Sequence, residues 1–236
     1  MIPLHRQPAP LSPLGLPNLV AWWSSDFGVT SALGAVSLVA DRSGNGYDLA
    51  QAGAGLRPTL VSSPGVHGKP VIVFDGADDY LKCAIAGLVQ PITVYMAYRI
   101  ISVTAFDRLF DGNASNSCGI YMTALNRLSM TAGTDVSVTD TYDVLPGTTT
   151  VIAAVFDSAQ QCWLDADKYY PVAAVGATNP GGFTLGARGN AGNAGNIEWG
   201  EAILFSGAHQ RAERDRIRRY LAQRWTTGQS LFVGNQ

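Results

Sequence analysis

The sequence predicts an all-β sandwich with a single α-helix near its C-terminus. Glycine and proline are plentiful, at 26 and 12 of 236 residues, whereas charged residues make up only 14% of the chain. This composition favours many tight turns over long helices. Apolar residues alternate along 197–205, which is typical of a buried strand. After a break at 206–209 they recur every three or four residues, which predicts a helix packed on the sheet.

Residues 1–17 contain five prolines and form a predicted N-terminal arm. Proline cannot donate to a sheet ladder and biases the backbone toward extended conformations. Two interpretations stay open, a disordered tail or a strap that orders on a neighbouring subunit, while the following domain folds unaided. The arm lacks the apolar core of a secretory signal, and no run reaches membrane-spanning length, so we expect cytoplasmic synthesis.

The first predicted strand, within 19–27, carries two adjacent tryptophans. Because successive side chains of a strand point to opposite faces, Trp22 and Trp23 should separate. One should lie in the core, and the other against the helix or nearer the surface.

The segment from Pro91 to Ile101 is predicted as a long central strand. Its core face should hold alternate residues: Ile92, Val94, Met96, Tyr98 and Ile100. Short strands follow, and 149–157 with 161–165 are predicted to form a hairpin.

The last predicted strand should place four large residues on one face: Ile197, Trp199, Ile203 and Phe205. Gly200 and Ala202 should lie opposite. The helix that follows should pack through one apolar stripe: Ile217, Tyr220, Leu221 and Trp225.

Gln210 stands three residues before Glu213, which is the spacing of a capping box. Glutamine is a poorer cap than Ser or Thr, so the start of the helix should be imperfect. Six of the thirteen arginines fall in this helix against two acids, and we interpret them as a solvated face in preference to a binding patch.

The strand, the break and the pattern Ile217-x-x-Tyr220-Leu221-x-x-x-Trp225 resemble the C-terminal end of laminin-G-like, concanavalin A-like jelly-roll domains. Two further motifs are similar to that family, the loop Asp41-Arg-Ser-Gly-Asn-Gly and the turn Phe74-Asp-Gly. The resemblance implies a two-sheet antiparallel jelly-roll sandwich closed by one C-terminal α-helix. It assigns 18–228 to this domain, between the arm at 1–17 and a tail at 229–236.

The Asp41 loop has two interpretations. Its glycines allow left-handed backbone, and Asp41 and Asn45 can bond backbone amides, which explains the loop as a turn. In related domains this loop can also offer oxygens to Ca²⁺, and Asp41, Asn45 and Asp48 would contribute here. The turn is the preferred interpretation, and the metal is left as unknown.

A second candidate site follows the predicted turn at Asp75-Gly76. Asp78, Asp79 and Tyr80 should gather at one end of the sandwich. Carboxylates beside an aromatic ring suit a carbohydrate site, although the same residues also suit an ordinary polar turn.

Several chemistries lack a sequence signal. Cys83, Cys118 and Cys162 have neither zinc spacing nor an even count, so we expect buried free thiols. The formal net charge of −2 gives no general attraction to nucleic acid or to an anionic membrane. The three glutamates do not form the carboxylate pair of a glycosidase, and the three histidines belong to no triad motif. We therefore predict that the protein is not an enzyme and needs no cofactor beyond the calcium considered above.

Two functions remain. The preferred one is a structural or decoration subunit of a bacteriophage particle, in the head, neck or tail, made in the host cytoplasm and assembled into the virion. Its partners would be other virion subunits in a multi-copy assembly or homo-oligomer, with a cell-surface glycan as a further partner. The alternative is a carbohydrate-binding or adhesion module. The free thiols, the arm and the stand-alone jelly roll favour the first.

Overall fold

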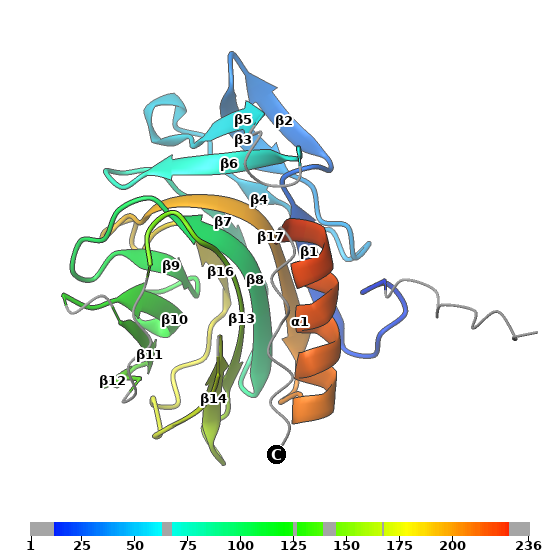
Figure 1. Ribbon diagram of the computed structural model, residues 1–236, viewed down its shortest axis with the longest axis vertical. Coiled ribbons are helices and arrows are strands. Elements are labelled where there is room, and N and C mark those ends of the chain that lie inside the picture. The colour runs from blue at the N-terminus through cyan, green and yellow to red at the C-terminus, as the bar shows by residue number, and fades with distance from the viewer. Residues whose placement is uncertain (1–11, 63–67, 125–126, 139–144, 167, 227–236) are drawn as a thin grey trace, which may run out of the picture.

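The computed structural model describes residues 12–62, 68–124, 127–138, 145–166 and 168–226. It forms two facing antiparallel sheets with one long helix on an outer face (Figure 1). The strands are β1 (Leu19–Ser24), β2 (Val29–Ala32), β3 (Ala35–Val39), β4 (Leu49–Ala50), β5 (Thr59–Ser62), β6 (Pro70–Asp75), β7 (Leu81–Ala84), β8 (Ile92–Ile100), β9 (Arg108–Asp111), β10 (Ser117–Met122), β11 (Leu128–Ala132), β12 (Asp135–Ser137), β13 (Thr149–Phe156), β14 (Cys162–Asp165), β15 (Tyr169–Val172), β16 (Gly182–Leu185) and β17 (Asn196–Ser206). A 3₁₀ turn, η1 (Ala54–Leu56), and the helix α1 (Arg211–Trp225) complete the described elements.

The helix-side sheet runs in the order β15, β14, β13, β8 and β17. The outer edge of β17 pairs with β1 along one half and with β6 along the other. The far sheet runs in the order β12, β11, β10, β9, β16, β7 and β4. Strand β3 joins the two sheets because it pairs with both β4 and β5. This architecture confirms the predicted fold class, a two-sheet antiparallel jelly-roll sandwich with one C-terminal helix.

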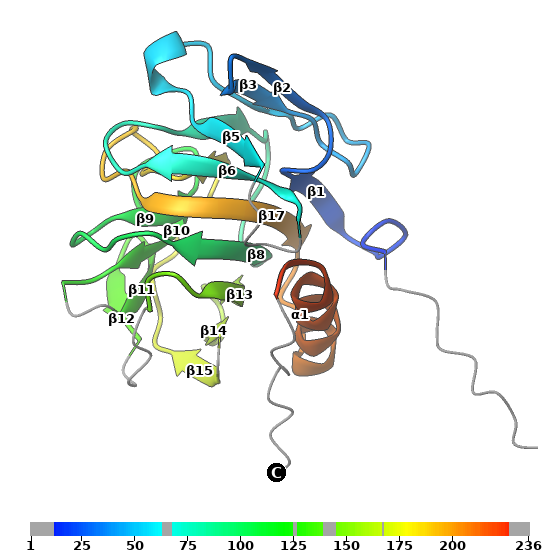
Figure 2. The same cartoon turned by 45° about the horizontal axis from the view of Figure 1, so that its top comes forward.

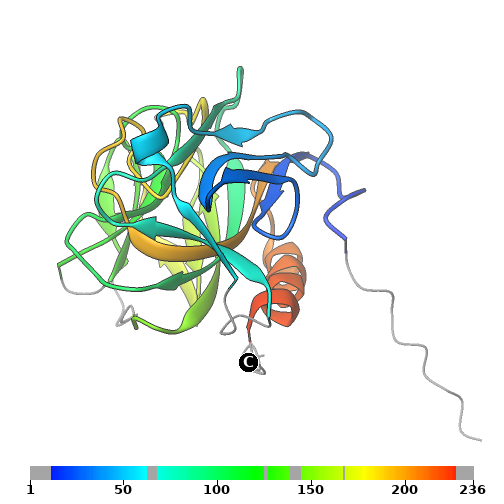
Figure 3. The same ribbon diagram turned by 90° about the horizontal axis from the view of Figure 1, so that it is seen from above.

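Two apolar layers follow from the two sheets. The main core lies between them, and Figure 2 shows the strands of both sheets and the helix from a second direction. A smaller layer, here called the helix-side cluster, lies between α1 and the outer face of the helix-side sheet: Trp22, Val71, Tyr95, Ala97, Val151, Ala153, Ile203, Phe205, Ile217, Leu221, Ala222 and Trp225. Figure 3 shows the helix outside this sheet when the molecule is seen from above.

Strand β8 confirms the predicted alternation. Its even-numbered residues from Ile92 to Ile100 all lie in the main core. Tyr95 and Ala97 point the other way, into the helix-side cluster. Both faces are buried because the main core covers one and the helix-side cluster the other, while β13 and β17 pair with the two edges.

Strand β17 departs from the predicted alternation. Ile197 and Trp199 face the main core, but Ile203 and Phe205 face the helix. The register against β8 shifts between Trp199 and Glu201. A β-bulge at this point inserts one residue and therefore exchanges the two faces of the strand beyond it.

The predicted helix stripe is confirmed, and the arginines on it are more buried than expected. Ile217, Leu221 and Trp225 are buried, while Tyr220 is half-buried. Arg214 and Arg218 are also buried, so the view of the arginines as one solvated face is wrong for these two. Their charged ends turn back toward the loop after β14, where Asp165 and the Ala166 carbonyl accept hydrogen bonds.

Gln210 is the N-cap of α1, as the capping-box spacing predicted. The carboxylate of Glu213 accepts a hydrogen bond of 2.8 Å from the Gln210 backbone N–H. Among the described residues, no helix has the length and apolar character needed to cross a bilayer.

The two adjacent tryptophans separate as predicted. Trp23 lies in the main core, and Trp22 lies under the helix, so both are buried. The three cysteines are free and buried, which confirms the expectation of buried free thiols. Burial raises the pKa of the Cys83 thiol to about 12.

Part of the predicted arm contacts the domain. Pro13 is buried and Leu16 packs against the helix-side cluster, whereas Leu14 is exposed. Residues 1–11 of the arm and the predicted tail at 229–236 lie outside the described residues.

Candidate functional site

The Asp41 loop is built around one fully used carboxylate. Oδ1 of Asp41 accepts hydrogen bonds from the backbone N–H groups of Trp22 and Ser43, at 2.9 and 2.8 Å. Oδ2 accepts from the Ser43 hydroxyl at 2.7 Å and from the Tyr47 N–H at 3.1 Å. A carboxylate offers about four lone-pair sites, so this one has no free site left for a cation.

Asn45 and Asp48 have similar structural tasks. The Asn45 side chain donates to the carbonyls of Leu19 and Val20, which ties the loop to β1. Asp48 accepts a hydrogen bond of 2.8 Å from the Asp41 N–H. These contacts favour the interpretation of the loop as a turn.

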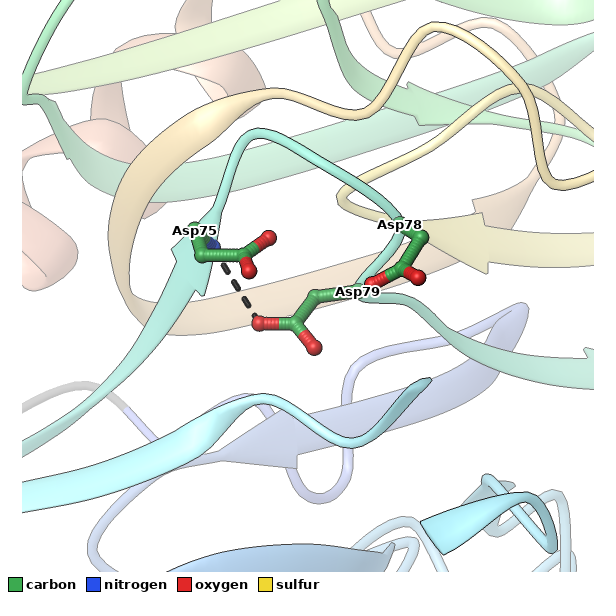
Figure 4. A group of neighbouring side chains, drawn as sticks. All are labelled: Asp75, Asp78 and Asp79. Atoms are coloured by element: carbon green, nitrogen blue, oxygen red, sulfur yellow. Dashed lines mark hydrogen bonds between the residues drawn. The ribbon is translucent and has the colours of Figure 1, made fainter. Parts of the chain in front are cut away.

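The second predicted group lies in the hairpin between β6 and β7. Gly76 takes a φ of 79°, as the predicted turn requires. Asp75, Asp78 and Asp79 offer carboxylate oxygens that lie within 4.8 Å of one another, and Figure 4 shows all three at one bend of the chain. We call these three residues the acidic turn.

Asp79 is the buried member of the acidic turn. Its Oδ2 accepts a hydrogen bond of 3.2 Å from the Asp75 N–H, and only 7% of the residue is exposed. Burial raises the pKa of this carboxyl to about 6, and the charges of Asp75 and Asp78 add to the rise against the lowering effect of the hydrogen bond. The turn could hold a divalent cation, but calcium needs six to eight oxygens and three carboxylates supply only part of that shell.

Tyr80 follows the acidic turn but is partly withdrawn from the surface. It is half-buried, and its backbone is tied to the loop around η1. Its N–H donates to the Leu56 carbonyl, and its carbonyl accepts from the Gln51 side chain, each at 3.3 Å. The five predicted site residues are therefore divided between two loops, Asp41 and Asn45 in one and the other three in the β6–β7 turn.

A cleft that the sequence analysis missed lies between the β13–β14 hairpin and the start of α1. Its volume is about 280 Å³. We call it the hairpin cleft, and its polar and aromatic lining consists of Asp157, Gln160, Gln161, Trp163, His209, Gln210 and Arg214. Hydrogen-bonding groups and one large aromatic ring thus meet in a single concave site.

Trp163 is the aromatic residue of the cleft that points away from the main core. Its neighbours on β14, Cys162 and Leu164, face the main core, so the alternation turns Trp163 outward. It is half-buried, whereas the other four tryptophans are buried. An outward tryptophan on a strand that otherwise faces the core was the signal in the sequence.

Arg214 holds one side of the cleft in place. Its guanidinium donates to Asp165 at 2.5 and 3.4 Å and to the His209 carbonyl at 3.0 Å. The guanidinium carbon also lies 5.1 Å from the centroid of the Trp163 ring. Burial raises the pKa of the Asp165 carboxyl despite the hydrogen bonds and charge of Arg214. The pair is therefore a rigid support for the ring beside it.

His209 lines the cleft next to Arg214. The ring atom Nδ1 and the Tyr95 hydroxyl are 2.7 Å apart. The backbone N–H of His209 donates to the Thr93 hydroxyl at 3.0 Å. Burial lowers the pKa of the imidazole, and the charge of Arg214 acts in the same direction. At neutral pH the ring is therefore mainly uncharged and offers hydrogen bonds rather than charge.

Each of the three glutamates has a structural contact. Glu198 pairs with Arg99, and Glu213 caps the helix. Glu201 is fully buried under α1 and accepts hydrogen bonds from four side chains: Trp22, Tyr220, Arg224 and Trp225. The bulge in β17 turns Glu201 to the helix side.

Three solved structures illustrate which known proteins have a similar fold. The binding domain of Paraclostridial Mosquitocidal Protein 1 matches with a TM-score of 0.63 and 12% identity, over 85% of this chain and 52% of that chain. Domain 4 of AbnA, a GH43 extracellular arabinanase from Geobacillus stearothermophilus in complex with arabinotriose, gives 0.59 and 14%, over 86% and 98%. Trypanosoma rangeli sialidase in complex with sialic acid gives 0.62 and 14%, over 89% and 34%.

These similarities concern the fold alone, because the identities are low. The chain spans about half of the mosquitocidal binding domain and about a third of the sialidase. No model of a protein family matches the sequence, and no curated protein sequence matches it.

Proposed function

We propose that this protein is a non-catalytic carbohydrate-binding module and that the sugar occupies the hairpin cleft. The observation that carries the proposal is the outward Trp163 residue, which lines the same cleft as four polar residues: Asp157, Gln160, Gln161 and Gln210. A sugar ring has one apolar face and a rim of hydroxyl groups. An aromatic surface with a few well-placed polar groups matches both parts.

The size of the cleft supports one bound sugar unit with the remaining chain in solvent. Small-molecule pockets commonly measure about 300–1,000 Å³, and this cleft, at about 280 Å³, is at the lower end. The fold adds support by analogy, because one similar domain was solved with arabinotriose. Asp157 accepts a hydrogen bond of 3.0 Å from the Ala159 N–H, and the His209 ring contacts the Tyr95 hydroxyl, so we assign both side chains to holding the site rather than to catalysis.

The test is a pair of tryptophan and phenylalanine variants. A glycan panel identifies a ligand for the wild-type protein, and titration calorimetry then measures its affinity for Trp163→Ala. We expect binding at least about tenfold weaker, which is about 1.4 kcal/mol, because aromatic residues commonly dominate such contacts. Phe27→Ala removes another partly exposed aromatic ring, outside the cleft, and should bind normally. Equal binding by wild type and Trp163→Ala would contradict this site.

We also propose where such a module works, on the surface of a bacteriophage particle after synthesis in the host cytoplasm. The arm supports this second proposal, because its prolines restrict the backbone and so lower the entropy lost on docking to a neighbouring subunit. The two proposals are compatible, since a particle can use a surface module to contact a cell-surface glycan. Copurification of the chain with assembled particles tests the placement, and its absence from them would contradict it.

A further inference from the structure

Arg108 is a buried cation without an adequate partner. The residue lies at the start of β9 and is only 1% exposed. Its Nη2 donates to the Asn116 side-chain oxygen at 2.5 Å, but Nε and Nη1 have no hydrogen-bond partner. Those two nitrogens carry three of the five N–H donors of a guanidinium. Burial lowers the pKa of Arg108, although arginine still stays charged near neutral pH.

The carboxylates of Asp111 and Asp135 attract the charge of Arg108 and raise its pKa against the effect of burial, but neither forms an ion pair with it. Asp111 is fully buried nearby, but its oxygens already accept hydrogen bonds from four backbone N–H groups, those of Gly112, Asn116, Ser117 and Gly189. Asp135 is exposed on β12. None of the ion pairs found in the described residues includes Arg108 or either of these aspartates. A buried charge left in this way is costly, which is unusual in a folded protein.

A second guanidinium converges on the same point. Nε of Arg188 donates to the Asn116 oxygen at 3.1 Å, so two cations share one neutral acceptor. The positive charge of Arg188 contributes to the lowered pKa of Arg108. Arg188 is half-buried, so it is the more exposed of the two arginines. An oxyanion between the two arginines would relieve both the missing hydrogen bonds and the repulsion.

An aromatic surface adjoins the two arginines. The Arg108 guanidinium carbon lies 4.3 Å from the centroid of the Tyr121 ring. Phe106 stacks on Tyr121 with ring centroids 6.1 Å apart and remains 55% exposed. A ligand whose charged group reaches Arg108 would have this exposed ring beside its remaining part.

We propose that Arg108, Arg188 and Asn116 form a receptor for an oxyanion, either the carboxylate of an acidic sugar or a free phosphate. It is a second site, separate from the hairpin cleft, and does not depend on the function proposed for that cleft. Because Nε and Nη1 of Arg108 are out of contact with water, binding requires the side chains that cover them to move. The ligand then replaces the missing counter-charge.

The experiment compares three probes in the full chain: sodium glucuronate, neutral glucose and inorganic phosphate. Melting temperature and calorimetry are recorded against sodium chloride of the same ionic strength. We expect glucuronate or phosphate to raise the melting temperature by a few degrees above the chloride control, because a ligand of the native state stabilises it by mass action. Neutral glucose is tested in the Trp163→Ala variant, so that binding in the hairpin cleft does not contribute. It should not raise the melting temperature of this variant. A response to glucuronate alone identifies an acidic sugar, and a response to phosphate identifies a general oxyanion site.

Two variants and a control decide whether the arginines are responsible. Arg188→Gln should weaken anion binding at least about tenfold, as expected for a lost charged hydrogen bond. Arg216→Gln, which changes an exposed arginine of α1, should bind like wild type. Arg108→Met keeps an apolar stem and removes the charge, so without anion it should melt no lower than wild type and should lose the anion response.

Three results would overturn the proposal. The first is the lack of any stabilisation beyond chloride by either anion. The second is equal anion affinity in Arg188→Gln and Arg216→Gln. The third is a clear loss of stability in Arg108→Met without anion, since that would mean the charge is already balanced within the folded chain by Asp111 and Asp135.

Discussion

Glu201 connects the helix to the sheet through a single buried carboxylate. Its side chain is fully buried, and Arg224 is the cation among its four donors. Trp22 comes from β1, whereas Tyr220, Arg224 and Trp225 come from α1, so one residue of β17 holds two other elements. The position is structural and explains why a glutamate is buried in an apolar layer.

We predict that Glu201→Gln lowers the free energy of unfolding by about 3 to 5 kcal/mol. The variant keeps the shape but removes the fully buried charge of Glu201, leaves Arg224 with Asp26 as its remaining carboxylate, and turns an amide N–H₂ toward other donors. Chemical denaturation measures the change. Glu198→Gln is the matched control on the same strand, where the Arg99 pair is more exposed and its loss should cost about 1 kcal/mol or less. Equal losses in both variants would contradict the role given to Glu201.

Asp79 makes stability depend on pH. Its pKa of about 6 in the folded chain exceeds the ordinary value of 3.8, so the folded state binds more protons between these values. Stability should therefore fall as pH rises through this window. Asp79→Asn should gain about 1 to 2 kcal/mol at pH 7, after allowance for solvent screening, and nothing below pH 4.

Denaturation curves at pH 4 and pH 7 test this prediction. Asp78→Asn, in the exposed neighbour, is the control and should gain less. A gain for Asp79→Asn that is the same at both pH values would rule out titration of this carboxyl as its cause.

Among the elements, α1 depends on close contact with the bulged part of β17. A Cβ added at Gly200 would lie 2.6 Å from Cε3 of Trp225, so glycine lets the ring rest on the strand. Trp225 also donates to Glu201 at 2.6 Å. The bulge, the glycine and the tryptophan therefore act as one contact between helix and sheet.

We predict that Trp225→Ala destabilises the protein by about 2 to 5 kcal/mol, because a large buried ring is replaced by a cavity. Urea denaturation provides the measurement. Arg216→Ala lies in the same helix on its exposed side and should change stability by no more than about 0.5 kcal/mol. An unchanged midpoint for Trp225→Ala would place the helix off the sheet.

At the scale of the whole molecule, the last residues of the N-terminal arm contact the domain. The sequence predicted that all of 1–17 is dispensable for folding of the domain. Pro13 and Leu16, however, pack on the domain, so the last part of the arm belongs to the fold. The domain therefore begins earlier than predicted, at about Pro13. The proposed docking strap is limited to the residues before it.

We predict that deletion of residues 2–11 leaves the melting temperature of the isolated chain nearly unchanged but abolishes its incorporation into particles. Deletion of 2–17 should also lower the melting temperature by several degrees, because the contacts of Pro13 and Leu16 are lost. Calorimetry and particle copurification measure the two effects. Normal incorporation of the shorter deletion would refute the strap and leave a free-standing binding module.

The sequence alone determined the features that depend on local periodicity. The alternation in Ile92–Ile100, the turn at Gly76 and the stripe of α1 follow from backbone geometry, which repeats every two or 3.6 residues whatever lies nearby. These patterns were enough for the fold class. They also placed Asp78, Asp79 and Tyr80 in one turn, since those residues are adjacent in the chain.

Only the tertiary structure decided which distant residues meet. The bulge at Gly200 turned Glu201 to the helix, and no periodic pattern contains an inserted residue. Trp163 and His209 come from separate elements and line one cleft only because α1 docks on the helix-side sheet. Arg108 and Arg188 meet at Asn116 because of how the loops of the far sheet pack. Contacts between such distant segments are set by tertiary packing and not by the local sequence of each segment.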